Sequence, residues 1–450
     1  MEQIGTGTTV DAANGDGGED PLRWLSSILW PDGGAHLLDD RRRKRPGADH
    51  ASVVAAGDGD LRIGFRWWAS PSATNAELLI PATSIEAART AVRRYHDGFT
   101  PGRRARSWAA ELLMRSPHLA ARVLDGRLVA ATGLVTEGVL VDVAAALARS
   151  GPLDELHVAI SLARPKSNRK PVLQLIDQNG MCIGWAKVGW NQWTRRLVDN
   201  EAEWLEREPR SPIITPRVLE RLHTGDRLVV VSSGVVGSRR PRRPSDQPPP
   251  PEVVLAIADL GTRTRLPLCE TPWWRSVQGV LGQGTEREIE AVERVAEAVG
   301  SSTIETGAWH GDLTPWNIMS PPSSRPSVRV GGTHGTVQVI DWEFAADGVP
   351  LGFDLCHFHT QVGVEMKGLS ARAALDRSAR LSPQGLARLG VDPHNQINTY
   401  RLYLVELIRR TLALRAAGMS VKGVEQGEAA TDRITGGLTA RNTEAPNPNG

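Results

Sequence analysis

A proline-rich stretch near the middle of the chain limits the possible architecture more than any other feature. Residues 237–251 read GSRRPRRPSDQPPPP, with six prolines in fifteen positions. Proline has a fixed φ and no amide hydrogen, so this stretch cannot lie inside a helix or a sheet. It separates a part of the chain with strand-like patterns from a part with helical ones. We therefore expect the 450 residues to form two or three units of different secondary structure.

The charge balance excludes some classes of partner. The chain has 53 basic and 51 acidic residues, a net charge of +2, and no long basic face. A protein whose main partner is nucleic acid or an acidic membrane usually has a stronger positive field. The short basic run SRRPRRP lies in the proline-rich stretch, where a solvated linker is the simpler interpretation.

Cysteine usage and the apolar stretches favour a cytoplasmic protein without a membrane span. Cys182, Cys269 and Cys356 are far apart and form no C-x-x-C pair, so neither a disulfide framework nor a cysteine-based zinc site is indicated. The N-terminal residues lack the apolar core of a signal peptide. The longest apolar stretch, residues 128–148, contains two acidic residues, whereas a span needs about 20 mostly uncharged ones.

Composition and periodicity divide the chain into five segments of an α+β protein. We expect two lobes, a five-stranded N-lobe and a mainly helical C-lobe, preceded by an extra α+β unit. The N-lobe pattern is three strands, one helix and two more strands. The segments are a mostly flexible 1–60, a small α+β unit at 61–150, the N-lobe at 151–236, the C-lobe with the catalytic loop at 237–422, and a disordered tail at 423–450.

The octet HGDLTPWN, residues 310–317, has a spacing that suits phosphoryl transfer. Asp312 and Asn317 lie five residues apart, and the strand-like VQVIDWE ends at Asp341, Glu343 following it. Such a reaction needs a carboxylate for the acceptor hydroxyl and oxygen ligands for Mg²⁺. We expect Asp312 to orient and deprotonate the hydroxyl, and Asn317 and Asp341 to hold the metal.

A cation for the phosphates should come from the strand-rich lobe. Lys187, on the third strand of that lobe, is the candidate, and it needs a carboxylate to hold its side chain. The next helix offers Glu201 and Glu203, which point to different sides because they are two residues apart. We favour Glu201, because Trp204 and Leu205 then lie on the same helix face and can pack beneath the sheet.

These motifs resemble those of the aminoglycoside phosphotransferase and choline kinase group, which has a two-lobed, protein-kinase-like fold. The catalytic-loop pattern matches at His310, Asp312 and Asn317, the metal-binding acid at Asp341, and a Gly-x-P-x-x-x-D-L pattern at 348–355. The resemblance covers about residues 155–420. It implies ATP between the lobes, Mg²⁺, and transfer of the γ-phosphate to a hydroxyl of a small molecule such as an aminoglycoside, a sugar, an amino sugar or an amino alcohol.

Two further residues of the matched motifs are expected to support the site. His310 should bond to the loop backbone rather than act as a base, and Asp354 should fix the catalytic loop. Glu343 is open between a place near the metal and a surface or structural role. His357 and His359 lack a third ligand residue, so a structural role is favoured over metal binding.

The phosphate-binding turn departs from the kinase pattern. No G-x-G-x-x-G lies between the first two strands of the N-lobe, where RPKSNRK, residues 164–170, stands instead. Backbone amides, Ser167 and the basic side chains of this turn are candidates for meeting the phosphates. Adenine should lie near the lobe connection at 230–234, which includes Ser233. ATP and GTP remain alternatives.

The sequence favours a small-molecule substrate over a protein. Gly311 stands before Asp312, where protein kinases have the arginine that couples the site to a phosphorylated loop. Only six residues separate Asp341 from Gly348, which leaves no room for a peptide-docking loop. Two alternatives stay open: a nucleotide-binding scaffold without turnover that docks a partner through its N-terminal unit, and a kinase of a protein or a carrier-bound glycan. The acceptor and the oligomeric state are open as well.

Overall fold

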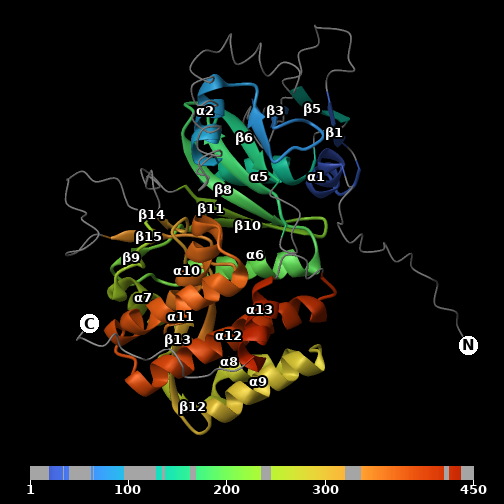
Figure 1. The fold of residues 1–450 in the computed structure, drawn as a ribbon. Helices are drawn as coiled ribbons and strands as arrows, with labels where there is room; N and C mark the ends of the chain where they lie inside the picture. Colours follow the sequence, from blue (N-terminus) through green and yellow to red (C-terminus); the bar gives the residue numbers. More distant parts are fainter. Residues whose placement is uncertain are drawn as a thin grey trace, which may run out of the picture.

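The computed structural model describes ten ranges of the chain: 20–33, 35–39, 62–63, 65–95, 128–133, 137–162, 169–234, 245–319, 336–419 and 425–436. A large sheet with its helices forms one end of the molecule, and a mainly helical part forms the other (Figure 1). Residues 106–117, whose sequence has the pattern of a helix, lie outside these ranges, as do most of the N-terminal segment 1–60 and most of the tail 423–450. The described chain is thus mixed α+β, with an antiparallel sheet and a helical part.

The large sheet contains the five strands expected for the N-lobe and continues beyond them. Its order is β1-β5-β3-β4-β6-β7-β8-β11-β10, all antiparallel, with β2 added parallel to β6. Strands from residues 35–133 thus extend one ten-stranded sheet, which is larger than the five strands predicted. The strands are β1 (Ala35–Asp39), β2 (Arg62–Ile63), β3 (Arg66–Ser70), β4 (Leu78–Pro81), β5 (Leu128–Gly133), β6 (Glu155–Ser161), β7 (Val172–Asp177), β8 (Cys182–Gly189), β10 (Val218–Thr224) and β11 (Arg227–Ser233).

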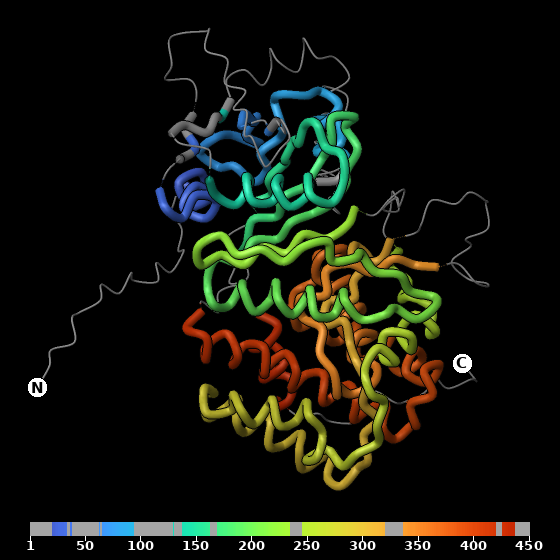
Figure 2. Tube along the Cα trace, turned by 180° about the vertical axis from the view of Figure 1, so that it is seen from behind, coloured from blue at the N-terminus to red at the C-terminus, as the bar shows by residue number. Residues whose placement is uncertain are grey.

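Helices cover both faces of this sheet because alternate strand residues are apolar on each side. Helices α1 (Pro21–Leu29) and α5 (Val139–Ser150) contribute to the core that includes Val158 and Leu175. Helix α2 (Ile85–Tyr95) packs on the opposite face against Ala159 and Ile176. Helix α6 (Gln192–Leu205) packs on β8 and β11 and lies between the sheet and the helical part (Figure 2).

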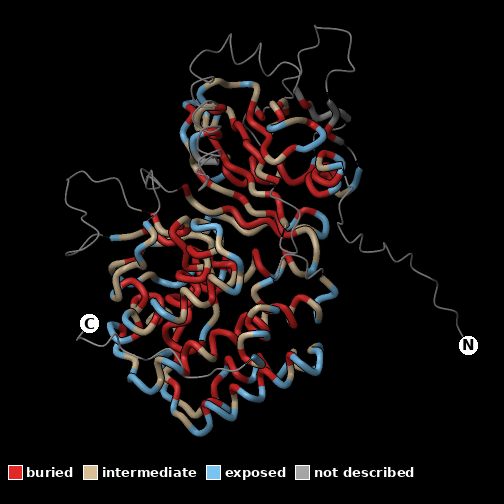
Figure 3. The backbone as a smooth tube through the Cα atoms, viewed as in Figure 1, coloured by how far each residue is buried: buried red, intermediate tan, exposed pale blue. Residues whose placement is uncertain are grey.

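The second half is built from helices around short strands. The strands form two small sheets, β12-β13-β16 and β14-β15-β9. Buried residues of these strands and of the helices form two hydrophobic clusters, and Figure 3 shows the buried stretches of the backbone. The strands are β9 (Ile213–Ile214), β12 (Thr264–Pro267), β13 (Thr303–Trp309), β14 (Ile318–Met319), β15 (Val337–Val339) and β16 (Ala346–Pro350). The helices are α7 (Pro251–Ala258), α8 (Pro272–Leu281), α9 (Glu286–Val299), α10 (Phe353–Gln361), α11 (Ala371–Arg388), α12 (Pro393–Ala416) and α13 (Glu425–Thr435), with a 3-10 turn at Leu268–Glu270 and a π-helical segment at Val362–Met366.

Three of these helices, α8, α11 and α13, have no counterpart in the sequence prediction, whereas α7, α9 and α12 occupy segments whose sequence has a helical pattern. Helix α13 lies in the tail that was expected to be disordered, and that expectation is wrong for residues 425–435, because Ala430 and Ile434 are buried in the core of the helical part. Helix α9 begins at a capping box of Thr285 and Glu288. None of the helices in the described ranges is both long and apolar enough to cross a membrane.

Candidate active site

The octet forms a tight loop at the end of β13. Gly311 has φ +80°, a left-handed conformation that glycine adopts without a steric cost. A Cβ atom at this position would lie 2.2 Å from the carbonyl oxygen of Phe344. Glycine is therefore required here by both backbone conformation and space, and it directs the next residue, Asp312, out of the strand.

Asp354 holds this loop from the first turn of α10. Its carboxylate accepts the backbone amides of His310 at 2.8 Å and Gly311 at 3.1 Å. Burial raises the pKa of Asp354 to about 7, although the two amides stabilise its charged form. Arg410 of α12 donates to the carbonyl oxygen of Gly311 at 2.6 Å, so the loop is fixed through both amide and carbonyl groups.

The Asp312 carboxylate is bound on both oxygens yet reaches solvent. Asn317 Nδ2 donates to Asp312 Oδ2 at 3.0 Å and to its backbone oxygen at 2.9 Å. His357 Nε2 lies 3.2 Å from Asp312 Oδ1, and the Asp312 side chain is 26% exposed. Burial, and then the charge of Asp341, raise the pKa of Asp312 to about 7. A carboxylate with such a pKa can accept a proton from a hydroxyl near neutral pH.

His310 is a neutral spacer beneath the loop. Its Nδ1 accepts the Asp312 amide at 3.2 Å, so its Nε2 carries the hydrogen that is donated to Ile340 O at 3.0 Å. Its ring packs against Trp342, with centroids 4.6 Å apart. Burial lowers the pKa of His310 to about 4, so it carries no charge at neutral pH.

Asn317 and Asp341 meet at one end of the β14–β15 ladder. Asn317 precedes β14, Asp341 follows β15 after one residue, and Ile340 N donates to Asn317 O at 3.0 Å. Asp341 has φ 71°, an uncommon value for a residue other than glycine, and its side chain is 35% exposed. Asn317 uses its Nδ2 for Asp312, which leaves its amide oxygen as the atom that a cation would use.

Lys187 of β8 connects the large sheet to this loop. Its Nζ lies 2.5 Å from Glu201 Oε2 on α6 and 2.5 Å from Asp341 Oδ1. Burial alone would lower the pKa of Lys187, but the charges of Asp341 and Glu201 raise it well above its ordinary value. Glu203 is exposed on another side of α6, so Glu201 is the residue that meets Lys187.

Helix α6 presents Glu201 because its other face is anchored beneath the sheet. The helix begins at a capping box of Asn191 and Thr194. Trp204, three residues after Glu201, is buried and stacks on Trp342, with ring centroids 6.3 Å apart. The Trp342 indole thus joins α6 to the segment after β15 that carries Asp341.

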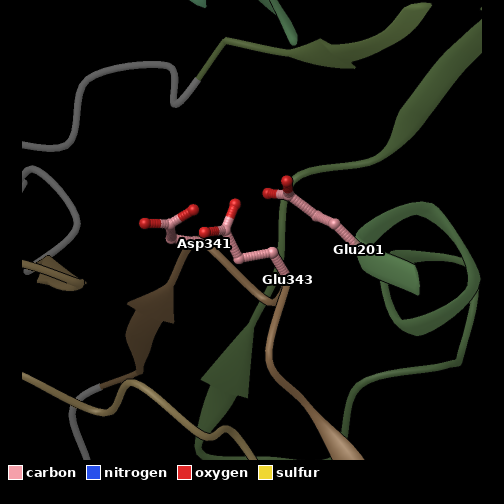
Figure 4. A group of neighbouring side chains, drawn as sticks. All are labelled: Glu201, Asp341 and Glu343. Atoms are coloured by element: carbon pink, nitrogen blue, oxygen red, sulfur yellow. The ribbon is translucent and has the colours of Figure 1, made fainter. Parts of the chain in front are cut away.

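Three carboxylates converge beside Lys187. Glu201, Asp341 and Glu343 each offer an oxygen within 4.8 Å of the others, and their side chains point toward one another (Figure 4). Hard Mg²⁺ prefers such oxygen ligands and retains several waters. The donor set around Asp341 therefore fits a magnesium ion, with Asp341 as its most exposed acid. Glu343 lies among these acids, which is one of the two roles expected for it.

The remaining predicted residues are not part of this group of contacts. Ser167 lies outside the described residues. Ser233, at the end of β11, uses its hydroxyl to accept the amide of Arg217 at 3.0 Å. His357, by contrast, contacts Asp312, which the prediction of a merely structural histidine missed; its position three residues after Asp354 on one helix face was the available signal.

The chain has counterparts among solved structures. A thermostable mutant of aminoglycoside phosphotransferase APH(4)-Ia is 14% identical, covering 65% of this chain and 98% of its own, with a TM-score of 0.36. Aminoglycoside phosphotransferase APH(3'')-Id from Streptomyces rimosus, in complex with ADP and streptomycin, is 18% identical over 52% of this chain and 88% of its own, with a TM-score of 0.28. Glucosamine kinase with glucosamine, ADP and inorganic phosphate is 12% identical over 69% and 85%, with a TM-score of 0.29.

This chain is similar to aminoglycoside phosphotransferases and glucosamine kinase. These are proteins of the kind that its motifs resemble. No protein-family model matches the sequence, and no curated protein matches it. Because the TM-scores are below 0.5, the assignment of chemistry to individual residues rests on the site geometry alone.

Proposed function

We propose that this protein transfers the γ-phosphate of ATP to a hydroxyl group of a small molecule, with Mg²⁺ as cofactor. One observation carries the proposal: Lys187 of the sheet bridges Glu201 and Asp341, while Asp312 and Asn317 are hydrogen-bonded to each other in the loop 310–317. A phosphate-binding cation, metal-binding oxygens and a carboxylate of raised pKa are the groups that phosphoryl transfer requires.

The residues divide the reaction between them. Asp312 accepts the hydroxyl proton as the acceptor oxygen forms its bond to the γ-phosphorus, and the bond from that phosphorus to the β-γ bridging oxygen breaks to leave ADP. Lys187, held by Glu201, places positive charge on the α- and β-phosphates. Asn317 and Asp341 would hold Mg²⁺, which when bound neutralises charge on the phosphate oxygens. Asp354 and His310 keep the loop in place.

The experiment is an acceptor screen with one substituted control. Purified protein with ATP and Mg²⁺ is tested against aminoglycosides, sugars, amino sugars and amino alcohols, and ADP release is measured. Asp312→Asn should lower kcat for the accepted compound at least 100-fold, since general-base catalysis contributes about 10²–10⁴. The matched control is Asp226→Asn, a substitution of a 61% exposed carboxylate, which should retain wild-type turnover.

The same screen separates the proposal from a kinase-like scaffold without turnover. An active phosphotransferase and a scaffold without turnover would both bind ADP, so ADP binding does not decide between the two functions. Release of ADP that depends on one acceptor, and that Asp312→Asn removes, supports the enzyme. Tight ADP binding with no transfer to any compound of the screen supports the scaffold. An Asp312→Asn variant as active as the wild type would show that Asp312 is not the base.

A further inference from the structure

Lys170 is a buried ammonium group beside the proposed nucleotide site. It is the last residue of the sequence segment RPKSNRK and lies two residues before Val172, the first residue of β7. Its Nζ forms an ion pair with Glu343, and the two side chains are only 7% and 4% exposed. Burying two charges costs several kcal/mol per ion before their attraction offsets it, and stability alone seldom requires such a pair. The place of this pair in the fold calls for a functional reason.

Sheet register puts Lys170 on the same face as Lys187. Lys187 of β8 pairs with Val172 of β7 in the antiparallel ladder. Directly opposed residues point to the same face, and so do residues two apart on one strand. Lys170 is two residues before Val172. The pairing with β8 continues at Pro171, whose carbonyl oxygen accepts the amide of Val188 at 3.1 Å. Lys170, just before β7, and Lys187 of β8 therefore point in the same direction, toward Glu343 and Asp341 of the helical part.

The residue before Lys170 is held in place by contacts from the N-terminal helix α1 and from two other parts of the sheet half. The guanidinium of Arg169 lies 3.7 Å from the ring centroid of Trp24 on α1. Trp190 Nε1 donates to the carbonyl oxygen of Arg169 at 2.8 Å, and Arg169 Nε donates to Leu162 O at 3.2 Å. The residue before Lys170 is thus anchored on three sides, which is the expected support for a side chain with a fixed target.

Two ammonium groups neutralise most of the charge of the three carboxylates. Lys187 contacts Glu201 and Asp341, and Lys170 contacts Glu343. A divalent cation that entered this group would compete with both lysines for the same oxygens. A lysine displaced from its carboxylate needs another anion close by, and the phosphates of a bound nucleotide are such anions.

We infer that Lys170 is a second phosphate-binding cation. When Mg²⁺ binds the Glu343 carboxylate, the Lys170 ammonium group moves from Glu343 to the phosphates of the nucleotide. This chain lacks the G-x-G-x-x-G pattern, and Lys170 supplies part of the phosphate contact that a glycine-rich loop would make. The inference rests on the proposed function, because it needs a nucleotide at this site. The inference predicts that Mg²⁺ and nucleotide favour each other's binding. The phosphates draw Lys170 away from the carboxylate that Mg²⁺ binds, and Mg²⁺ occupies the carboxylate that otherwise holds Lys170.

The test measures two affinities of the full-length protein that should change in opposite directions. Lys170→Met should bind ADP in EDTA at least 10-fold more weakly by calorimetry, because a charge-assisted contact is lost. The same variant should bind Mn²⁺ alone, followed by EPR, at least threefold more tightly, because Glu343 is no longer neutralised. Adenosine, which has no phosphate, should bind as to the wild type.

The matched control is Lys367→Met, which removes an ammonium 46% exposed and paired with Asp246 at 2.7 Å; it should change none of these affinities. Unchanged ADP and Mn²⁺ affinities in Lys170→Met would overturn the inference, leaving Lys170 as a structural ion pair. If that variant fails to fold, Glu343→Gln decides: freed from its carboxylate, Lys170 should give tighter ADP binding in EDTA, and weaker binding would overturn the inference.

The design keeps this failure distinct from failure of the proposed function. If the wild-type protein binds neither adenosine nor ADP, no nucleotide site exists, and the proposed function fails together with the role of Lys170. If the wild type binds both, and Lys170→Met binds ADP equally well, the nucleotide site stands and only the second cation is wrong.

Discussion

Replacing Glu406 with glutamine should destabilise the helical part of the protein strongly. Glu406 of α12 is fully buried. It accepts four hydrogen bonds, three from guanidinium groups and one from an indole. Arg409 donates at 2.6 and 2.8 Å, Arg410 at 2.9 Å, and Trp273 Nε1 at 2.8 Å. Glutamine keeps the shape but removes the charge, so two arginines, themselves 24% and 22% exposed, lose their counterion.

Two routes give a similar magnitude for this substitution. Breaking a buried ion pair by removing one partner costs about 3–5 kcal/mol. Despite burial, Arg409 and Arg410 lower the pKa of Glu406 from 4.5 to about 2. At about 1.4 kcal/mol per pKa unit, that shift corresponds to about 3 kcal/mol. We therefore expect Glu406→Gln to lower the free energy of unfolding by about 3 kcal/mol at pH 7.

The sign of the pH dependence follows from the lowered pKa. A carboxylate with a depressed folded-state pKa stabilises the protein fully above its unfolded value, here near 4.5, and loses that contribution as the pH falls toward 2. The difference between the wild type and Glu406→Gln should therefore be constant from pH 7 to about 5. It should then shrink by about 1.4 kcal/mol for each pH unit below 4.5.

The assay is urea unfolding of both proteins between pH 7 and pH 3.5, followed by tryptophan fluorescence. Glu290→Gln is the matched control, because Glu290 also pairs with an arginine four residues on, Arg294, but is 51% exposed. An exposed pair of this kind contributes about 0.3–0.5 kcal/mol. Equal effects of the two substitutions, or a Glu406→Gln effect that stays constant down to pH 3.5, would refute the reasoning.

Three other substitutions test the loop and its surroundings. Gly311→Ala should lower stability by about 3 kcal/mol in a urea titration, since it adds a left-handed alanine and a clash with Phe344 O; an unchanged midpoint contradicts this. His357→Ala should lower kcat about 10-fold at constant KM for ATP, because Asp312 loses a hydrogen-bond partner. His357→Gln should recover part of the lost kcat. A change in KM alone argues against a role of His357 in positioning Asp312. Trp342→Ala should destabilise the protein by about 3–5 kcal/mol in the same titration, because its fully buried indole leaves a cavity; a loss under 1 kcal/mol contradicts this.

Local spacing in the sequence indicated which residues lie together in the loop 310–317. Asp312 and Asn317, singled out by their five-residue interval, share a hydrogen bond, although their roles stay predictions. Helix geometry predicted that Glu201, rather than Glu203, would meet Lys187. Both inferences depend on short-range geometry, which the sequence specifies directly through helix periodicity and loop length.

Other contacts that depend on tertiary packing were not predicted. Thr83 and Glu86 have the sequence spacing of a capping box before α2, but Ser84 accepts the amide of Ala87 at 3.2 Å, and Thr83 bonds to His157 of β6 instead. Both residues are good caps, and only the docking of the helix on the sheet distinguishes them. The continuation of the sheet through residues 35–133 was missed for the same reason, since alternation predicts strands but not their neighbours.

Ammonium groups from the sheet half meet acidic groups of the helical half at one site, and Glu201 of α6 adds a third carboxylate from the sheet half. The helical part contributes Asp341 and Glu343 on a segment held by the stacking of Trp342 beneath α6. The ammonium groups come from β8, which carries Lys187, and from the segment just before β7, which carries Lys170, and the pairing of β7 with β8 fixes their direction. Coulomb energy in a partly buried site changes by several kcal/mol over a few ångström, so a shift of the sheet relative to the loop would alter every pair at once. A rigid, extended sheet therefore serves the electrostatics of the site as well as stability.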